Sequence, residues 1–142
     1  MSLLRGLKPE PQRQVGALCC DRKTGQVLLI TSRGTGRWII PKGWPVPDLG
    51  RPGSALQEAW EEAGVRGEVV SQIGRYDYDK LLDNGGSVLV RVQVFLALVD
   101  GLADDFPEAG QRHRRWFQPA KAAGLVDEKG LRKILRDLPG RK

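Results

Sequence analysis

The sequence contains one histidine and two cysteines in 142 residues, which excludes several kinds of catalytic and metal site. His113 alone supports neither a zinc-binding cluster nor a serine–histidine triad. Cys19 and Cys20 are adjacent in an apolar run. This placement predicts small core residues on opposite faces of a strand rather than a disulfide or a metal site. We therefore expect a reducing, cytoplasmic setting for the protein.

Long hydrophobic stretches are also missing. No apolar run approaches the roughly 20 residues that a membrane-spanning helix needs. Residues 1–8 are too short and too polar for a secretory signal. We therefore expect no membrane partner.

The charge is unbalanced toward lysine and arginine, with 23 basic and 17 acidic residues and a net charge of +6. A basic surface attracts polyanions such as nucleic acid, a membrane surface or a polyphosphate. The sequence has no run of basic residues and no periodic basic–aromatic pattern, so a nucleic-acid partner is not favoured. Length and composition predict one globular domain over residues 1–142, as either a monomer or a homodimer.

Hydrophobic periodicity predicts a protein of the α/β or α+β class, because strands outnumber helices. After a loose lead-in at residues 1–12, we expect strands at residues 14–20, 26–31, 38–40, 68–73, 74–79, 87–99 and 114–117. A turn at 21–25 joins the first two strands, a turn at 83–86 precedes the sixth, and 41–53 reads as a long loop. Helices are expected from about residue 52 to 63, from 119 to 124 and from 128 to 138.

The first of these helices carries Glu58, Glu61 and Glu62 at positions i, i+3 and i+4, which lie on one helical face. The other side is apolar, with Leu56, Ala59, Trp60 and Ala63. Three neighbouring carboxylates repel one another unless a cation lies among them. Hard oxygen ligands in this arrangement suit Mg²⁺ or Mn²⁺. For the three glutamates taken alone, a solvated acidic face is the commoner alternative.

Two signals compete for the start of this helix. Pro52 suits the first helical position, whereas Ser54 and Gln57 have the spacing of a capping box, which starts the helix later. Its end is clearer, because Gly64 fits a left-handed C-terminal cap before Val65 enters the next strand.

The spacing from Gly43 to Val65 resembles the Nudix box. That pattern has a glycine, five residues, a glutamate, seven residues, Arg-Glu, an aliphatic residue, any residue, Glu-Glu, any residue, a glycine and an aliphatic residue. The positions that match it are Gly43, Glu58, Ala59, Glu61, Glu62, Gly64 and Val65. Residues 38–43 and 114–117 resemble the flanking segments of Nudix hydrolases of diadenosine polyphosphates and diphosphoinositol polyphosphates. The likeness covers about residues 13–138.

This resemblance implies an α/β/α sandwich with a mixed central sheet and a loop–helix–loop that binds divalent metal. It implies hydrolysis of a small-molecule phosphoanhydride, a diphosphate linked to a variable group. Glu58 and Glu62 are expected as direct ligands of Mg²⁺ or Mn²⁺, with Glu61 as the third and the Gly43 carbonyl as a further ligand. Glu61 or Glu62 is the first candidate for the general base, and Glu108 is the second.

Two positions depart from the box. Leu49 replaces its first glutamate, for which the neighbouring Asp48 is a candidate substitute. Gln57 replaces its arginine, so it can donate a hydrogen bond but brings no charge. These departures leave open an alternative function, a Nudix-fold ligand-binding or regulatory module with weakened catalysis.

Lys42, which adjoins Gly43, is the first candidate for binding substrate phosphate. Weaker candidates, each with a solvent-facing alternative, are Arg13, Arg33, Arg37 and Arg91. Trp38 and Tyr76 are candidates for stacking on a base, although a core position is favoured for Trp38. Trp60 is predicted to lie in the core.

Overall fold

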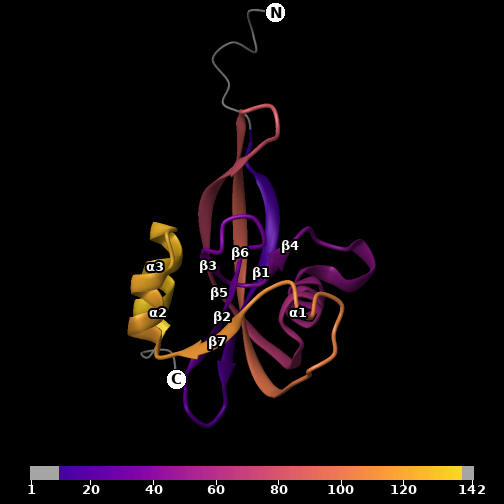
Figure 1. The fold of residues 1–142 in the computed structure, drawn as a ribbon, viewed down its shortest axis with the longest axis vertical. Helices are drawn as coiled ribbons and strands as arrows, with labels where there is room; N and C mark the ends of the chain where they lie inside the picture. The colour runs from indigo at the N-terminus through magenta and orange to yellow at the C-terminus, as the bar shows by residue number, and fades with distance from the viewer. Residues whose placement is uncertain (1–9, 139–142) are drawn as a thin grey trace, which may run out of the picture.

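The computed structural model describes residues 10–138, which form a mixed sheet with helices on both faces (Figure 1). The strands are β1 (Gln12–Asp21), β2 (Val27–Thr31), β3 (Trp38–Ile39), β4 (Lys42–Gly43), β5 (Val65–Leu81), β6 (Ser87–Leu102) and β7 (Arg114–Phe117). The main path of the sheet runs β3-β2-β1-β6-β5, with β4 added to β1 and β7 added to β2. β1 and β6 are parallel, and the other pairs are antiparallel.

The helices make the outer layers. α1 (Gly50–Ala63) covers one face, whereas α2 (Pro119–Leu125) and α3 (Lys129–Asp137) cover the other (Figure 1). Side chains of β1 alternate between two cores: Ala17 and Cys19 pack on the α1 side, and Leu18 packs on the α2–α3 side. The predicted α/β/α sandwich is confirmed.

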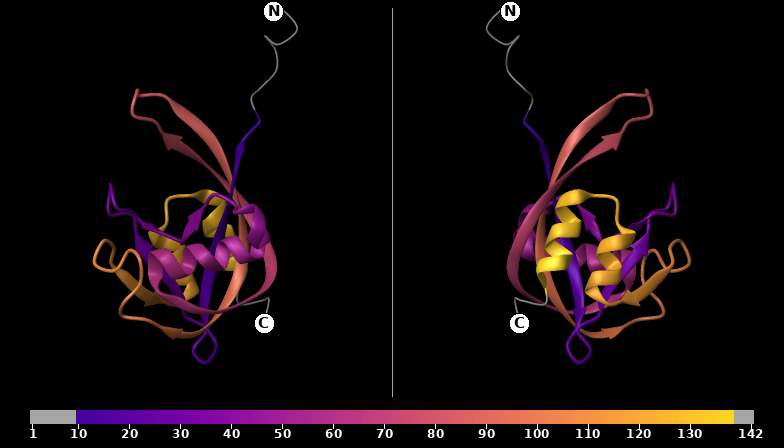
Figure 2. Two further views of the ribbon diagram at one scale, coloured as in Figure 1. Left: turned by 90° about the vertical axis from the view of Figure 1, so that its right-hand side faces the viewer. Right: turned by 90° about the vertical axis from the view of Figure 1, so that its left-hand side faces the viewer.

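The predicted strand boundaries need two main changes. β1 already includes Gln12, so the predicted lead-in is too long, and residues 1–9 lie outside the described part. The two strands predicted at residues 68–79 are one long strand, β5, whose pairing with β6 shifts register at three places. These irregularities let the strand bend without ending. The predicted turn at 83–86 is confirmed, and Figure 2 shows the β5–β6 hairpin extending beyond the rest of the sheet.

The predicted long loop at 41–53 contains regular structure. It includes β4 and a 3-10 helix, η2 (Pro47–Leu49), and α1 begins at Gly50. Both predicted helix starts are therefore wrong. Ser54 is no N-cap: its buried hydroxyl accepts a hydrogen bond from the Val46 amide at 2.8 Å and contacts the Gly50 carbonyl. The Ser54 hydroxyl therefore binds the preceding loop and is not available to cap the helix as a capping box requires.

The C-terminal end of α1 agrees with the prediction. Gly64 has φ 68° and ψ 26°, the left-handed conformation that a glycine adopts without strain. Arg114 also donates a hydrogen bond from a guanidinium nitrogen to the Ala63 carbonyl at 2.7 Å, which satisfies a terminal acceptor of the helix.

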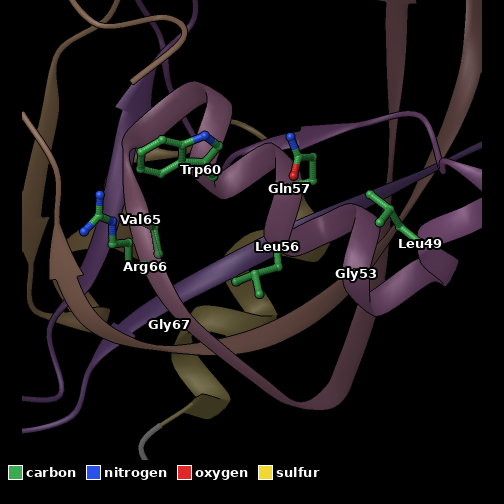
Figure 3. Close-up of a pocket in the computed structure, with 8 residues that line it drawn as sticks. All are labelled: Leu49, Gly53, Leu56, Gln57, Trp60, Val65, Arg66 and Gly67. Carbon is green, nitrogen blue, oxygen red and sulfur yellow. The ribbon is translucent and has the colours of Figure 1, made fainter. Parts of the chain in front are cut away.

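The buried stripe of α1 consists mainly of small residues. Ala55, Ala59 and Ala63 are fully buried against the sheet. Trp60 is only partly buried, so its predicted core position is wrong. α1 packs the methyl side chains of its alanines on the sheet, and the indole instead forms one end of a surface groove (Figure 3). The Arg66 guanidinium carbon lies 5.5 Å from the centre of the Trp60 ring.

Both cysteines are buried and free of disulfides, as predicted. Within residues 10–138, no helix is long and apolar enough to cross a membrane.

Candidate catalytic site

The helix α1 and the strand β4 come close together at Glu58 and Gly43. Antiparallel pairing of Val15 with Gly43 holds β4 on the edge of β1, where it faces α1. A Cβ atom at position 43 would overlap the Glu58 carboxylate. A side chain at position 43 would therefore have to displace the Glu58 carboxylate, and the first residue of the box-like pattern lies directly against its second matched residue.

Glu62 approaches the same strand one helical turn later. Its Oε1 accepts a hydrogen bond from the Lys42 amide at 3.1 Å, and its Oε2 lies 3.5 Å from a guanidinium nitrogen of Arg112. Burial raises the pKa of Glu62, and Arg112 and the Lys42 amide oppose that rise. Burial, followed by repulsion from Glu62 and Glu61, raises the pKa of Glu58 to about 7. Removal from water is therefore the main reason that the charged forms of both carboxylates are disfavoured.

Glu61 is held by the residue that departs from the pattern. The Gln57 side-chain amide donates a hydrogen bond to Glu61 Oε1 at 2.9 Å. Gln57 therefore orients one of the glutamates, and its predicted alternative role as the capping-box partner of Ser54 is wrong.

Arg112 is the site residue that the sequence did not reveal. Its side chain is only 8% exposed, and it binds acidic groups from two segments. Besides Glu62, its Nε donates a hydrogen bond to Glu108 Oε1 at 3.0 Å, and a terminal nitrogen donates to the Thr31 carbonyl at 3.1 Å. Arg112 lies in a basic stretch with Arg114 and Arg115, and no spacing distinguishes it from them. This guanidinium supplies the charge that Gln57 lacks.

The carboxylate oxygens near β4 are ligands that suit a hard divalent cation, because several negative charges lie close together there. Glu58 and Glu62 meet at Lys42–Gly43, whereas Glu61 Oε1 is engaged by Gln57. Among residues 10–138, no three His, Cys, Asp or Glu side chains are already gathered around one point. Metal coordination by all three glutamates and the Gly43 carbonyl therefore stays a prediction.

The predicted phosphate-binding residues do not form one cluster, and Lys42, Arg33 and Arg37 each contact a different part of the protein. The Lys42 ammonium hydrogen-bonds the Tyr78 hydroxyl at 3.0 Å and lies 4.5 Å from the centre of its ring. Arg33 Nε lies 3.9 Å from a Glu108 oxygen. Arg37 pairs instead with acidic residues before α3, Asp127 at 3.1 Å and Glu128 at 3.5 Å.

Arg13 and Arg91 are the two predicted residues that the fold brings side by side, as direct partners across β1 and β6. The aromatic candidates have structural positions. Tyr76 is buried in the α2–α3 core, so stacking on a base is wrong for this residue. Trp38 is partly buried and packs against the α2–α3 core, edge-on to Phe117 with ring centres 5.1 Å apart, so it lies at the margin of the core.

A family model described as the NUDIX domain matches residues 10–138. The chain belongs to the Nudix family. Mouse diphosphoinositol polyphosphate phosphohydrolase 3-alpha is 31% identical to it over 119 residues, covering 80% of this chain and 69% of the relative. Human diphosphoinositol polyphosphate phosphohydrolase 3-beta is 30% identical over 127 residues, covering 86% and 74%.

Solved structures show the same fold. A Caenorhabditis elegans Ap4A hydrolase binary complex matches with a TM-score of 0.68 and 18% identity, covering 92% of this chain and 96% of the other. Escherichia coli dihydroneopterin triphosphate pyrophosphohydrolase matches with a TM-score of 0.72 and 13% identity, covering 94% and 100%. The chain is a Nudix pyrophosphohydrolase, as the sequence predicts.

Within this Nudix domain, Leu49 lies at the surface. Its side chain is 46% exposed and forms one end of the groove that Trp60 and Arg66 close at the other (Figure 3). The adjacent Asp48 is exposed on η2. A contact between Asp48 and the glutamates of α1 stays a prediction.

Proposed function

We propose that this Nudix hydrolase cleaves a phosphoanhydride bond with Mg²⁺ or Mn²⁺ held by Glu58, Glu61, Glu62 and the Gly43 carbonyl. The observation that carries the proposal is the approach of the Glu58 and Glu62 carboxylates to β4, in surroundings that raise the pKa of both. A bound divalent ion would neutralise the diphosphate and activate a water molecule.

The contacts of Glu62, Glu61 and Glu108 support different catalytic roles for these three carboxylates. Glu62 is buried and fixed by two donors, the Lys42 amide and Arg112, which suits a metal ligand. Glu61 is partly exposed and has the neutral partner Gln57. Glu108 is already engaged by Arg112 in an ion pair. We therefore favour Glu61 as the residue that accepts the proton of the attacking water.

For the substrate, we propose a diphosphoinositol polyphosphate or a diadenosine polyphosphate. The similarity to phosphohydrolases named for the first class supports the former. The likeness to the Ap4A hydrolase shows the fold alone, so the second class rests on the sequence resemblance. We further expect the protein in a reducing, cytoplasmic compartment, in keeping with two buried cysteines that form no disulfide within residues 10–138. We expect a monomer or a homodimer, which light scattering would distinguish.

The test is hydrolysis of both substrate classes, with products identified, in Mg²⁺, in Mn²⁺ and in chelator. Glu58→Gln and Glu62→Gln should each lower kcat by at least about a hundredfold, on the scale of losing a group that stabilises the transition state. Glu68→Gln is the matched control, because this exposed glutamate only pairs with Arg22 at the surface. Circular dichroism would establish that each variant is folded. Unchanged rates in either α1 variant, or full turnover in chelator, would contradict the proposal.

The alternative, a ligand-binding module with weakened catalysis, rests on Leu49. Gln57 argues less for it, since its amide still orients Glu61. Leu49→Glu separates the two functions: if the absent glutamate limits catalysis, this substitution raises kcat. Tight metal-dependent ligand binding without product would favour the binding module.

A further inference from the structure

A basic pocket of about 190 Å³ lies beside the first turn of α1. Four arginines line it, Arg13, Arg51, Arg75 and Arg91, together with the amide side chains of Gln72 and Gln93. The box-like pattern specifies neither Arg51, which is at one of its unspecified positions, nor Arg75, which lies outside it. The pocket therefore gathers more positive charge than the sequence alone indicates.

Strand register builds the floor of this pocket. Arg13 of β1 is the direct partner of Arg91 of β6, and two residues further along β6, Gln93 is the direct partner of Arg75 of β5. Residues two apart share a face of a sheet, and adjacent strands lie about 4.8 Å apart. Arg51 approaches from α1, with a guanidinium nitrogen 3.4 Å from the Gln93 side-chain oxygen.

The charges in the pocket are largely uncompensated. Arg91 forms two hydrogen bonds with Asp77, at 2.8 and 3.1 Å. Within residues 10–138, Arg13, Arg51 and Arg75 form no salt bridge, and Arg75 acts on Asp77 only through longer-range attraction. Guanidinium groups crowded in this way repel one another, and they bind phosphate with planar, paired hydrogen bonds. The pocket is therefore built to hold an anion.

The pocket borders the candidate catalytic site. Val15 lines it and is the direct partner of Gly43 across β1 and β4. Arg51 precedes Glu58 by seven residues on α1, which places both on the same side of the helix, about 10 Å apart along its axis. A ligand whose diphosphate lies at Glu58 can place another phosphate at the arginines.

We propose that Arg13, Arg51, Arg75 and Arg91 form a subsite for a substrate phosphate remote from the bond under attack. The inference rests on the proposed function and narrows it. A diphosphoinositol polyphosphate carries phosphates around its ring and can fill the subsite. A diadenosine polyphosphate offers only internal phosphates, each with one negative charge, whereas phosphomonoesters on an inositol ring carry up to two. The arginines thus favour the inositol-based substrate.

Binding can be tested without catalysis, using myo-inositol hexakisphosphate, which has no phosphoanhydride bond. Isothermal titration in chelator should show binding to the wild type and at least about tenfold weaker binding to Arg51→Gln/Arg75→Gln, because hydrogen bonds between charged groups are lost. Arg115→Gln/Arg136→Gln is the matched control, since both residues are exposed and line no part of the pocket. Thermal unfolding would confirm that both double variants fold.

Kinetics provide the second readout. The Arg51→Gln/Arg75→Gln variant should raise KM for a diphosphoinositol polyphosphate at least about tenfold and leave its kcat within about twofold. It should raise KM for diadenosine tetraphosphate by less than about threefold. An equal rise in KM for both substrates would overturn the proposed selectivity.

The outcomes separate this inference from the proposed function. Equal hexakisphosphate affinity in the wild type and the pocket variant would overturn the subsite even if metal-dependent hydrolysis is found. Arginine-dependent binding in a protein that hydrolyses neither substrate would support the subsite and refute the proposed function.

Discussion

Arg112→Gln is expected to destabilise the protein by leaving two carboxylates without their cation. Arg112 is nearly buried and contacts Glu62 and Glu108, whose side chains are 10% and 21% exposed. Removing one partner of a buried ion pair costs about 3–5 kcal/mol. The 3.5 Å separation from Glu62 and the partial exposure of Glu108 place this case at the low end, about 3 kcal/mol. For a chain of this size, that loss lowers Tm by about 10 °C.

The loss of stability in Arg112→Gln should depend on pH, and the contacts of Arg112 give the direction of that dependence. Arg112 opposes the burial that raises the pKa of Glu62, so its removal lets that pKa rise further. The folded variant then binds a proton more readily than the unfolded chain does. Its deficit relative to the wild type is therefore larger at pH 8 than at pH 5, because proton uptake by Glu62 at lower pH removes the unpaired charge.

Urea unfolding in chelator at pH 8 and pH 5 measures both effects. Arg115→Gln is the matched control, because Arg115 is exposed and its substitution should change stability by less than about 0.5 kcal/mol. A double-mutant cycle with Glu62→Gln should give a coupling free energy of at least about 1 kcal/mol. Additive effects in that cycle, together with an equal loss at the two pH values, would show that Arg112 acts by packing and by its contact with the Thr31 carbonyl.

Three further predictions concern single residues. Without metal, the Glu58 carboxyl, whose pKa is raised to about 7, should make the free energy of unfolding fall as pH rises from 4.5 to 7. Allowing for its partial exposure, we expect a fall of about 1–2 kcal/mol in urea titrations, absent in Glu58→Gln and offset by Mg²⁺; a slope unchanged in the variant would exclude Glu58 as its source. Gly43→Ala should displace the Glu58 carboxylate and lower kcat at least about tenfold while Tm changes little, so wild-type kcat would refute the close approach. Cys19, whose pKa burial raises to about 12, should resist alkylation at pH 8 until the protein unfolds, and mass spectrometry would detect premature labelling.

Much of the fold and part of the candidate site could be predicted from local sequence patterns. The three glutamates of α1 share a face because helical geometry alone places positions i, i+3 and i+4 together. Gly64 marks the end of that helix because a glycine adopts the left-handed conformation at no steric cost. By contrast, the helix start was missed, since the Ser54 hydroxyl binds the loop before it instead of capping.

Trp60 shows the limit of hydrophobic patterning. Its position on the apolar side of α1 predicts burial, yet alanines make the buried contact with the sheet and the indole remains partly exposed. Patterning identifies an apolar side of a helix, but the distance between helix and sheet selects which residues on that side face the core.

The sequence by itself determined the identity and order of the carboxylates and the glycine that approaches them, because their spacing is set within one turn–helix segment. Only the tertiary structure decided which cationic side chains lie near these carboxylates. Arg112 reaches Glu62 from a distant loop. The parallel pairing of β1 with β6 places Arg13 beside Arg91, and β5 and α1 add Arg75 and Arg51. Charged side chains on separate elements come together only when the strands pair in register and the helix packs on the sheet. Local sequence periodicity carries no information about these long-range contacts.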